Sequence, residues 1–213
     1  MRPGVDLRLM LVTDTALSQP RGLIATVLAA VAGGVTIVQL RDKHATDIEL
    51  AVTAAWLRDE LAGTGVALIV NDRPQVTLEA GLSGVHIGQS DGHPAAARAL
   101  LGPDALIGLS VTSPDEIDTV DPDVVDYVGL GPVFATSTKP DAAAPLGLEG
   151  MHIIGERLPV PYIAIGGITL DNAAATISAG ASGVAVVSAI AGALEPRSAA
   201  LALRRAIDTA QGA

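Results

Sequence analysis

The chain has no cysteine among its 213 residues. This absence excludes disulfide bonds and metals held by thiolates, and it agrees with a reducing compartment such as the cytoplasm. Basic residues are also few, with 13 Lys and Arg against 23 Asp and Glu and a net charge of -10. Nucleic-acid-binding proteins present basic surfaces, so we expect no nucleic acid partner. Any anionic ligand must be held by local groups.

Segments that would direct the chain to a membrane are also lacking. Residues 1–10 have no apolar core of the signal-peptide kind, so we expect a cytoplasmic protein. Residues 23–40 are almost uncharged and long enough to resemble a membrane span. The pair Gly33 and Gly34 divides this segment into a helix and a β-branched strand, so we expect no membrane role.

What the chain does contain is eight short apolar runs, rich in Val, Ile and Leu and nearly continuous. Such runs are typical of strands that are buried on both faces of a parallel sheet. Segments with helical spacing lie between most of them, and 213 residues can bury one sizeable core. We therefore predict an α/β fold, a (β/α)8 TIM barrel in a single domain over residues 1–213, with a doubly wound open sheet as the alternative. The runs cover residues 8–14, 36–43, 67–73, 84–91, 106–113, 125–136, 161–168 and 183–190.

Active sites of such barrels lie at the carboxyl ends of the strands, and the second run ends in alternating polar residues. Gln39, Arg41 and Lys43 follow one another at a spacing of two, so an extended chain places them on one side and Leu40 and Asp42 on the other. Two cations at the mouth of a barrel predict an anionic ligand. The alternative interpretation is an exposed, salt-bridged strand end.

Carboxylates end the next two runs. Asp72 lies at the end of the third run and Asp91 at the end of the fourth, so both are expected at neighbouring strand ends. Two unpaired carboxylates about 4 Å apart repel by roughly 4 kcal/mol at an effective dielectric of about 20, and a shared cation would relieve this repulsion. Mg²⁺ suits oxygen ligands and bridges to substrate phosphates. The alternative is that Asp72 pairs with Arg73 or caps the helix that begins near Pro74.

The sixth run leads into a loop that has the composition of a phosphate-binding site. Thr136, Ser137 and Thr138 supply three hydroxyls, and Lys139 supplies a point charge. The alternative is a plain flexible loop, since residues 140–145, with the sequence PDAAAP, are typical of a mobile segment.

The seventh and eighth runs end where many barrels bind phosphate through backbone N–H groups. Gly166 and Gly167 lie near the end of the seventh run, and Val187 and Ser188 near the end of the eighth. The glycines have a simpler explanation as a tight turn.

Taken together, six ordered blocks resemble the thiamine phosphate synthase family over nearly the whole chain. The blocks are QLRDK (39–43), VNDR (70–73), GVHIGQSD (84–91), GLSVTS (108–113), DYVGLGPVFATSTK (126–139) with PLGLEG (145–150), and AIGGI (164–168) with GASGVAVVSAI (180–190). The resemblance implies a Mg²⁺-dependent enzyme that joins hydroxymethylpyrimidine diphosphate to a thiazole phosphate. Thiamine phosphate and diphosphate are then formed by a dissociative alkyl transfer, with no protein nucleophile.

The resemblance also implies roles for single residues. Asp72 and Asp91 would hold Mg²⁺, and the catalytic residues would be Arg41, Lys43, Ser110 and Lys139. Of these, the three cations would stabilise the departing diphosphate. The pyrimidine diphosphate would be bound by Gln39, Leu40, Arg41, Asp42, Lys43, Asn71, Ser110 and Lys139, and the thiazole phosphate by Thr136, Ser137, Thr138, Gly167, Val187 and Ser188.

Some positions depart from the family pattern or stand outside it. Ala135 replaces a frequent proline and Ser83 a frequent aspartate, and we expect both to affect loop rigidity more than chemistry. His86 falls within the fourth run and is expected to be a structural residue of the barrel. Trp56 is expected to pack within a helix layer.

Three other functions remain open. A thiazole tautomerase shares the barrel but needs a general base, and Thr112 stands where we associate a histidine with that activity. The other two are a sensor that binds a phosphate ligand without turnover and a different phosphate-sugar barrel enzyme. The expected partners are small-molecule substrates, and the chain can either act alone or pair through its helices as a homo-oligomer.

Overall fold

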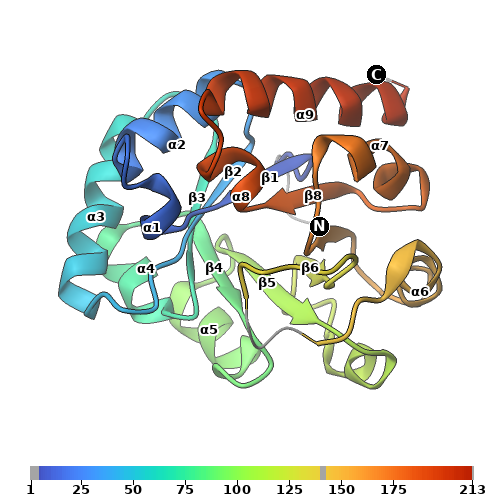
Figure 1. Cartoon of the computed structure of the whole chain (residues 1–213). Helices are drawn as coiled ribbons and strands as arrows, with labels where there is room; N and C mark the ends of the chain where they lie inside the picture. The colour runs from blue at the N-terminus through green and yellow to red at the C-terminus, as the bar shows by residue number, and fades with distance from the viewer. Residues whose placement is uncertain (1–4, 140–142, 213) are drawn as a thin grey trace.

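A computed structural model describes residues 5–139 and 143–212. Its eight strands are hydrogen-bonded in chain order, all parallel, and β1 also pairs with β8 (Figure 1). This closed sheet confirms the predicted barrel and excludes the open, doubly wound alternative. The strands are β1 Leu9–Val12, β2 Ile37–Leu40, β3 Ala67–Asn71, β4 Gly84–Ile87, β5 Leu106–Val111, β6 Tyr127–Leu130, β7 Tyr162–Ile165 and β8 Gly183–Val186.

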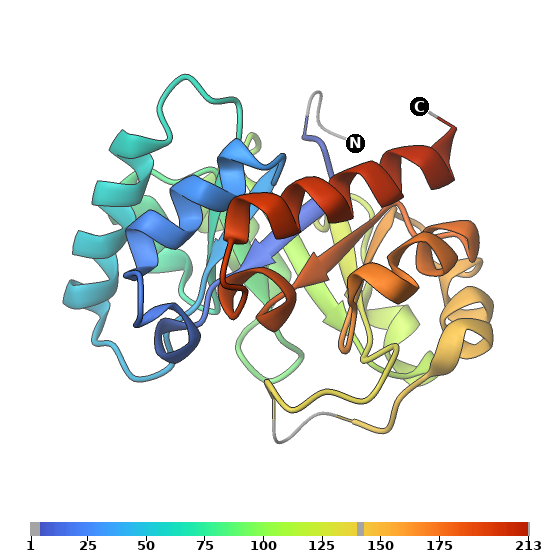
Figure 2. The same cartoon turned by 45° about the horizontal axis from the view of Figure 1, so that its top comes forward.

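Helices surround the barrel and connect consecutive strands. The longest, α9, packs against α7 and α2, so the C-terminal helix lies beside the first long helix of the chain (Figures 1 and 2). Between β5 and β6 the connection is only a short 3-10 helix, η1 (Pro114–Thr119). The α-helices are α1 Thr15–Ser18, α2 Leu23–Ala32, α3 Asp47–Glu60, α4 Pro74–Ala80, α5 Pro94–Leu101, α6 Gly147–Gly155, α7 Leu170–Ser178, α8 Ser188–Ala191 and α9 Pro196–Gln211.

Local sequence signals set several helix ends. Thr46 accepts a hydrogen bond from the backbone N–H of Glu49, whose side chain bonds back to the Thr46 backbone, so this capping box begins α3. Gly81 ends α4 in the left-handed conformation, with φ 64°, a region that glycine enters without steric cost.

The strands are apolar on both faces, as their nearly continuous hydrophobic runs predict. Successive residues alternate between the barrel interior and the layer under the helices. Met10 and Ile37 belong to the inner cluster, whereas Leu11 and Val38 belong to the large outer cluster. The same alternation places polar side chains at the inner carboxyl ends of the strands, where the core gives way to a cavity.

The segment over residues 23–40 divides as expected, into α2 and β2 with the glycine pair between them. In the part of the chain that the structure describes, no helix is long and apolar enough to cross a membrane.

The prediction that Trp56 packs within a helix layer is wrong, because its side chain is 58% exposed. The inward face of α3 is already filled by Leu50, Ala54 and Leu57, which are buried. Residues of an α-helix are about 100° apart around the axis, so the residue next to Leu57 turns away from the barrel.

Candidate active site

A cavity of about 210 Å³ opens at the carboxyl end of the barrel. Its walls come from the ends of strands that are far apart in the sequence, which only closure of the barrel brings together. Most of the predicted site residues line it, and the exceptions are Leu40, Asp42 and Ser137. Those that line it are Gln39, Arg41, Lys43, Asn71, Asp72, Asp91, Ser110, Thr136, Thr138, Lys139, Gly167, Val187 and Ser188.

The end of β2 shows why alternate residues reach the cavity. Gln39, Arg41 and Lys43 line it, as the spacing of two predicts, and Gln39 is buried. Leu40 instead lies in the outer cluster under the helices. Asp42 accepts hydrogen bonds from the Thr15 hydroxyl (2.9 Å) and from the backbone N–H of His44 (2.9 Å), so it anchors the loop before α3.

Three cations face the cavity: Arg41, Lys43 and Lys139. Among the described residues, none of these three forms a salt bridge with a carboxylate. Within the part of the chain that the structure describes, Arg41 and Lys43 therefore do not form the salt bridges that the alternative interpretation of this strand end requires. Their positive charge is available to a bound anion.

Asp72 is held in an unusual backbone conformation. Its φ is 62°, in the left-handed region that non-glycine residues seldom adopt. Its N–H donates to the His86 carbonyl oxygen (2.8 Å), and its carboxylate accepts from the Asn71 side-chain amide and the Gly88 N–H (3.3 Å for the latter). Burial raises the pKa of Asp72, and the negative charge of Asp91 raises it further.

Both alternatives for Asp72 are wrong. Arg73 donates to Asp47 (2.8 Å) and to the Ala45 carbonyl oxygen (2.8 Å) instead. The helix α4 begins without a side-chain cap. The carboxylate of Asp72 is therefore left to face the cavity.

The carboxylate of Asp91 lies close to Gly88, which also contacts Asp72. A Cβ atom on Gly88 would lie 2.3 Å from Oδ2 of Asp91, so Asp91 folds over this position, and the Gly88 N–H bonds to Asp72. No group of three or more His, Asp or Glu that could hold a metal occurs among the described residues. Two carboxylates suit Mg²⁺, which usually takes one or two protein carboxylates and completes its shell with water and substrate phosphates. The donor set therefore fits Mg²⁺ shared with a phosphorylated ligand.

The loop after β6 also lines the cavity, and β5 separates β6 from β4 in the strand order. The hydroxyls of Thr136 and Thr138 are 2.9 Å apart, and both residues line the cavity, whereas Ser137 is exposed and does not. A Cβ atom on Gly167 would lie 2.5 Å from the Ala135 carbonyl oxygen, so the glycine turn after β7 packs directly against this loop. Of the segment expected to be mobile, residues 140–142 lie outside the described residues.

His86 lies inside the barrel at the base of the cavity, within β4 as expected. Its Nδ1 atom is 2.9 Å from the Tyr127 hydroxyl and its Nε2 atom is 2.9 Å from the Ser110 hydroxyl. Burial lowers the pKa of His86 to about 4, and the positive charge of Lys139 contributes. The imidazole is therefore neutral near pH 7.

We expect this buried imidazole to make the protein sensitive to mild acid. Unfolding returns His86 to its ordinary pKa of 6.5, so the unfolded chain binds the additional proton between about pH 6.5 and 4, and stability falls as the pH falls through this range. The loss attributable to His86 is roughly 3 kcal/mol. Urea unfolding at pH 7.5, 5.5 and 4.5 should show a shallower pH dependence in His86→Gln than in the wild type. Equal slopes would contradict the assignment.

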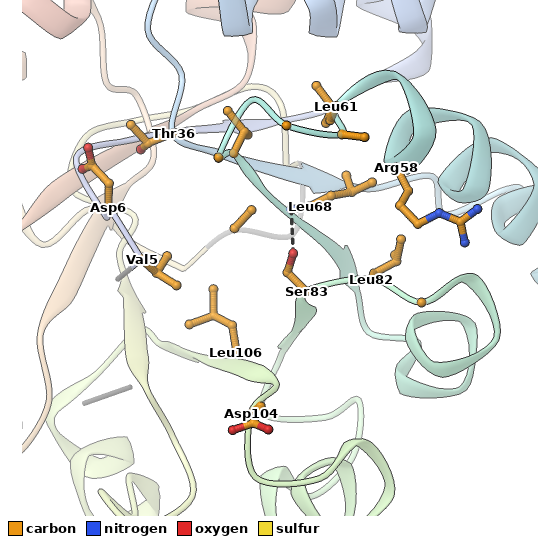
Figure 3. A pocket seen from close by; sticks show the side chains of 16 residues that line it. Val5, Asp6, Thr36, Arg58, Leu61, Leu68, Leu82, Ser83, Asp104 and Leu106 are labelled. Carbon is orange, nitrogen blue, oxygen red and sulfur yellow. Dashed lines mark hydrogen bonds between the residues drawn. The ribbon is translucent and has the colours of Figure 1, made fainter. Parts of the chain in front are cut away.

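A second cavity, of about 480 Å³, lies at the opposite, amino end of the barrel (Figure 3). Several of its polar side chains are engaged within the protein: Asp6 with Arg8, and Arg58 with the Ala80 carbonyl oxygen (2.7 Å). Ser83, one of the two departures from the family pattern, lies here and accepts a hydrogen bond from the Leu68 N–H (3.3 Å). This departure is therefore remote from the cavity at the carboxyl end.

Sequence reasoning missed several residues of the carboxyl-end cavity. Val12, Ile165 and Ala185 form part of its apolar floor, and Thr169 lies at its edge. The alternation of each strand places the first three toward the barrel interior, which the sequence could have indicated. Tyr127 was also missed, because nothing in its neighbourhood along the chain reveals its contact with His86.

These features define a protein of the (β/α)8-barrel class with a polar cavity at its carboxyl face, where enzymes of this fold carry their active sites. The chain belongs to the thiamine monophosphate synthase family, whose model matches residues 9–190. It is thus a member of a transferase family of thiamine biosynthesis.

Individual proteins agree with this assignment. The thiamine-phosphate synthase of Azorhizobium caulinodans is 48% identical over 206 residues, which cover 97% of each chain. That of Psychrobacter sp. is 50% identical over 197 residues, covering 91% of this chain and 92% of the relative. Among solved structures, the thiamine phosphate pyrophosphorylase from Pyrococcus furiosus superposes with a TM-score of 0.87 at 33% identity, covering 97% of this chain and 98% of the other.

Proposed function

We propose that the chain joins 4-amino-2-methyl-5-hydroxymethylpyrimidine diphosphate to 4-methyl-5-(2-phosphooxyethyl)thiazole, giving thiamine phosphate and diphosphate. The observation that carries this proposal is the convergence of Arg41, Lys43 and Lys139 with Asp72 and Asp91 on one cavity. Three cations suit a highly charged diphosphate, and two carboxylates suit the metal ion that accompanies it. We propose that these two small molecules are the binding partners of the protein and that the enzyme acts in the cytoplasm.

The difficult step is the departure of diphosphate from the methylene carbon. The C–O bond breaks and its electron pair stays with the diphosphate, so negative charge grows on the leaving oxygen. Arg41, Lys43 and Lys139 stabilise this charge, and because they are already positioned at the cavity, little reorganisation is needed. Mg²⁺ held by Asp72 and Asp91 would add positive charge at the same leaving group.

The chain needs no base or nucleophile for the second step. The thiazole nitrogen donates its lone pair to the methylene carbon, so a C–N bond forms and no proton is removed. Of the described histidines, only His86 lines the cavity, and both of its ring nitrogens are hydrogen-bonded. The hydroxyl of Thr112 is bonded to Glu116 (3.1 Å). These contacts favour alkyl transfer over the proton transfer of a tautomerase.

The walls of the cavity divide the two substrates. Gln39, Asn71 and Ser110 lie on β2, β3 and β5, the side of the cavity that also carries Arg41, Lys43 and the two carboxylates, and they would hold the pyrimidine diphosphate. The thiazole phosphate would lie against the opposite wall, where hydroxyls and backbone N–H groups are available. That wall comprises Thr136, Thr138, Gly167, Val187 and Ser188.

The direct test mixes the purified protein with both substrates, with and without Mg²⁺, and follows thiamine phosphate and diphosphate by mass spectrometry. We expect equimolar, Mg²⁺-dependent appearance of both products. Saturable binding of the thiazole phosphate without any product would contradict the proposal and favour a tautomerase or a sensor. Product formation at the same rate with and without Mg²⁺ would support the proposed reaction but contradict the proposed metal site.

A further inference from the structure

Tyr127, His86 and Ser110 are linked by hydrogen bonds inside the barrel, and the proposed reaction gives this network no role. The Tyr127 hydroxyl contacts Nδ1 of His86, and Nε2 of His86 contacts the Ser110 hydroxyl, each at 2.9 Å. Tyr127 and His86 are buried, whereas Ser110 is half-buried and lines the cavity. These hydrogen bonds therefore connect the apolar interior of the barrel with the cavity that would hold the substrates.

A glycine makes room for this contact. His86 on β4, Gly108 on β5 and Tyr127 on β6 are consecutive partners in the sheet register. A Cβ atom on Gly108 would lie 2.3 Å from Cζ of Tyr127 and 2.5 Å from Nδ1 of His86, in the space that the two rings use to meet. Gly129, beside Ser110 in the register, leaves similar room next to the His86 ring. The contact between His86 and Tyr127 therefore depends on the residues of three adjacent strands, β4, β5 and β6.

The direction of the hydrogen bonds follows from the surroundings of Tyr127. Its hydroxyl is enclosed with apolar side chains such as Met10, Ile69 and Ile163. Within the described residues, its one hydrogen-bond partner is Nδ1 of His86. If Nδ1 carried the proton, the phenol hydrogen would lack an acceptor, and an unsatisfied buried donor is costly. The phenol therefore donates to Nδ1, and the neutral imidazole carries its proton on Nε2.

This tautomer determines what Ser110 can do. Because the Nε2–H group donates to the Ser110 oxygen, the serine hydroxyl hydrogen is left to point into the cavity. We propose that Tyr127 and His86 are positioning residues that hold Ser110 as a hydrogen-bond donor toward an acceptor atom of the bound pyrimidine diphosphate. That the acceptor belongs to a pyrimidine diphosphate rests on the proposed function, whereas the orientation of the Ser110 hydroxyl does not.

The first experiment measures the tautomer of His86 in the wild-type protein by ¹⁵N NMR of the imidazoles, with His86→Gln to assign its signals. We expect Nε2 to be protonated and Nδ1 to be unprotonated at pH 7. Protonated Nδ1 with unprotonated Nε2 would reverse every hydrogen bond in the chain and overturn the proposal. This measurement needs no activity, so its result stands whether or not the protein makes thiamine phosphate.

The second experiment is a double-mutant cycle on turnover. Tyr127→Phe removes the phenol and lets the imidazole change its tautomer, so we expect kcat to fall about tenfold, the size of one lost hydrogen bond. The KM for the thiazole phosphate should be unchanged. In a Ser110→Ala background the same substitution should cost less than about twofold, because the tyrosine acts only through the serine hydroxyl.

Tyr162→Phe is the matched control, because its phenol lies 3.5 Å from the Ala179 carbonyl oxygen and does not line the cavity. It should retain wild-type kinetics. Losses from Tyr127→Phe and Ser110→Ala that multiply in the double variant would indicate a merely structural tyrosine and overturn the proposal. If Tyr127→Phe fails to fold, the tautomer measurement decides. Absence of product from the wild type would instead contradict the proposed function alone.

Discussion

Lys139→Ala is expected to lower kcat by about 10²–10³-fold, the usual effect of removing one group that stabilises an oxyanion in a transition state. Lys139 lines the cavity and, among the described residues, forms no salt bridge, so its charge is available to the leaving diphosphate. The thiazole phosphate would be bound by other groups, so its affinity should change by less than about threefold. Steady-state kinetics with each substrate varied, together with calorimetric binding of the thiazole phosphate, separates the two effects.

Arg157→Ala is the control for this substitution. It removes an exposed positive charge at the end of α6, outside the cavity, and should leave both constants unchanged. A Lys139→Ala enzyme that loses turnover and thiazole phosphate affinity by the same factor would contradict the assignment. The lysine would then be a general anchor for phosphate and not a group that acts mainly in the transition state.

Asp91→Asn is expected to lower turnover by at least about 100-fold and to raise the Mg²⁺ concentration needed for half-maximal rate. Even residues that only support a metal ligand typically cost 10–100-fold when changed. Asp91 and Asp72 meet over Gly88, and burial together with the Asp91 charge raises the pKa of Asp72. A bound cation would relieve this repulsion, so loss of one carboxylate should weaken the metal and the diphosphate together.

The measurement is a Mg²⁺ titration of the initial rate in the wild type and the variant. Asp123→Asn makes the same change of charge on an exposed residue before β6, outside the cavity, and should titrate like the wild type. An unchanged Mg²⁺ requirement in Asp91→Asn would remove the metal assignment from this residue, whatever happens to the rate.

Much of the site could be predicted because strand ends are visible in the sequence. Nearly continuous apolar runs mark strands buried on both faces, and the carboxyl ends of all strands of a parallel barrel meet at one face. Arg41, Asp72 and Lys139 could therefore be expected at this face without knowledge of their neighbours, and all three line the cavity. The period of two along β2 also predicted which side chains turn to the same side, although the sequence did not reveal that Asp42 serves the α3 loop.

Other features required neighbours that are distant along the chain. The exposure of Trp56 follows from which face of α3 turns toward the barrel, and only the structure shows that this face is formed by Leu50, Ala54 and Leu57. The left-handed backbone of Asp72 depends on hydrogen bonds to His86 and Gly88 from the next strand.

The barrel and the polar residue types at its carboxyl face follow from the local order of apolar and polar residues, so they can be predicted from the sequence. Which of these side chains contact one another depends on strands that are distant along the chain. The contact between His86 and Tyr127 crosses Gly108, a residue on the strand between them, and exists because the sheet register aligns all three. The residue-by-residue register depends on packing between strands that are distant along the chain, so the local order of residues does not show which side chains will meet.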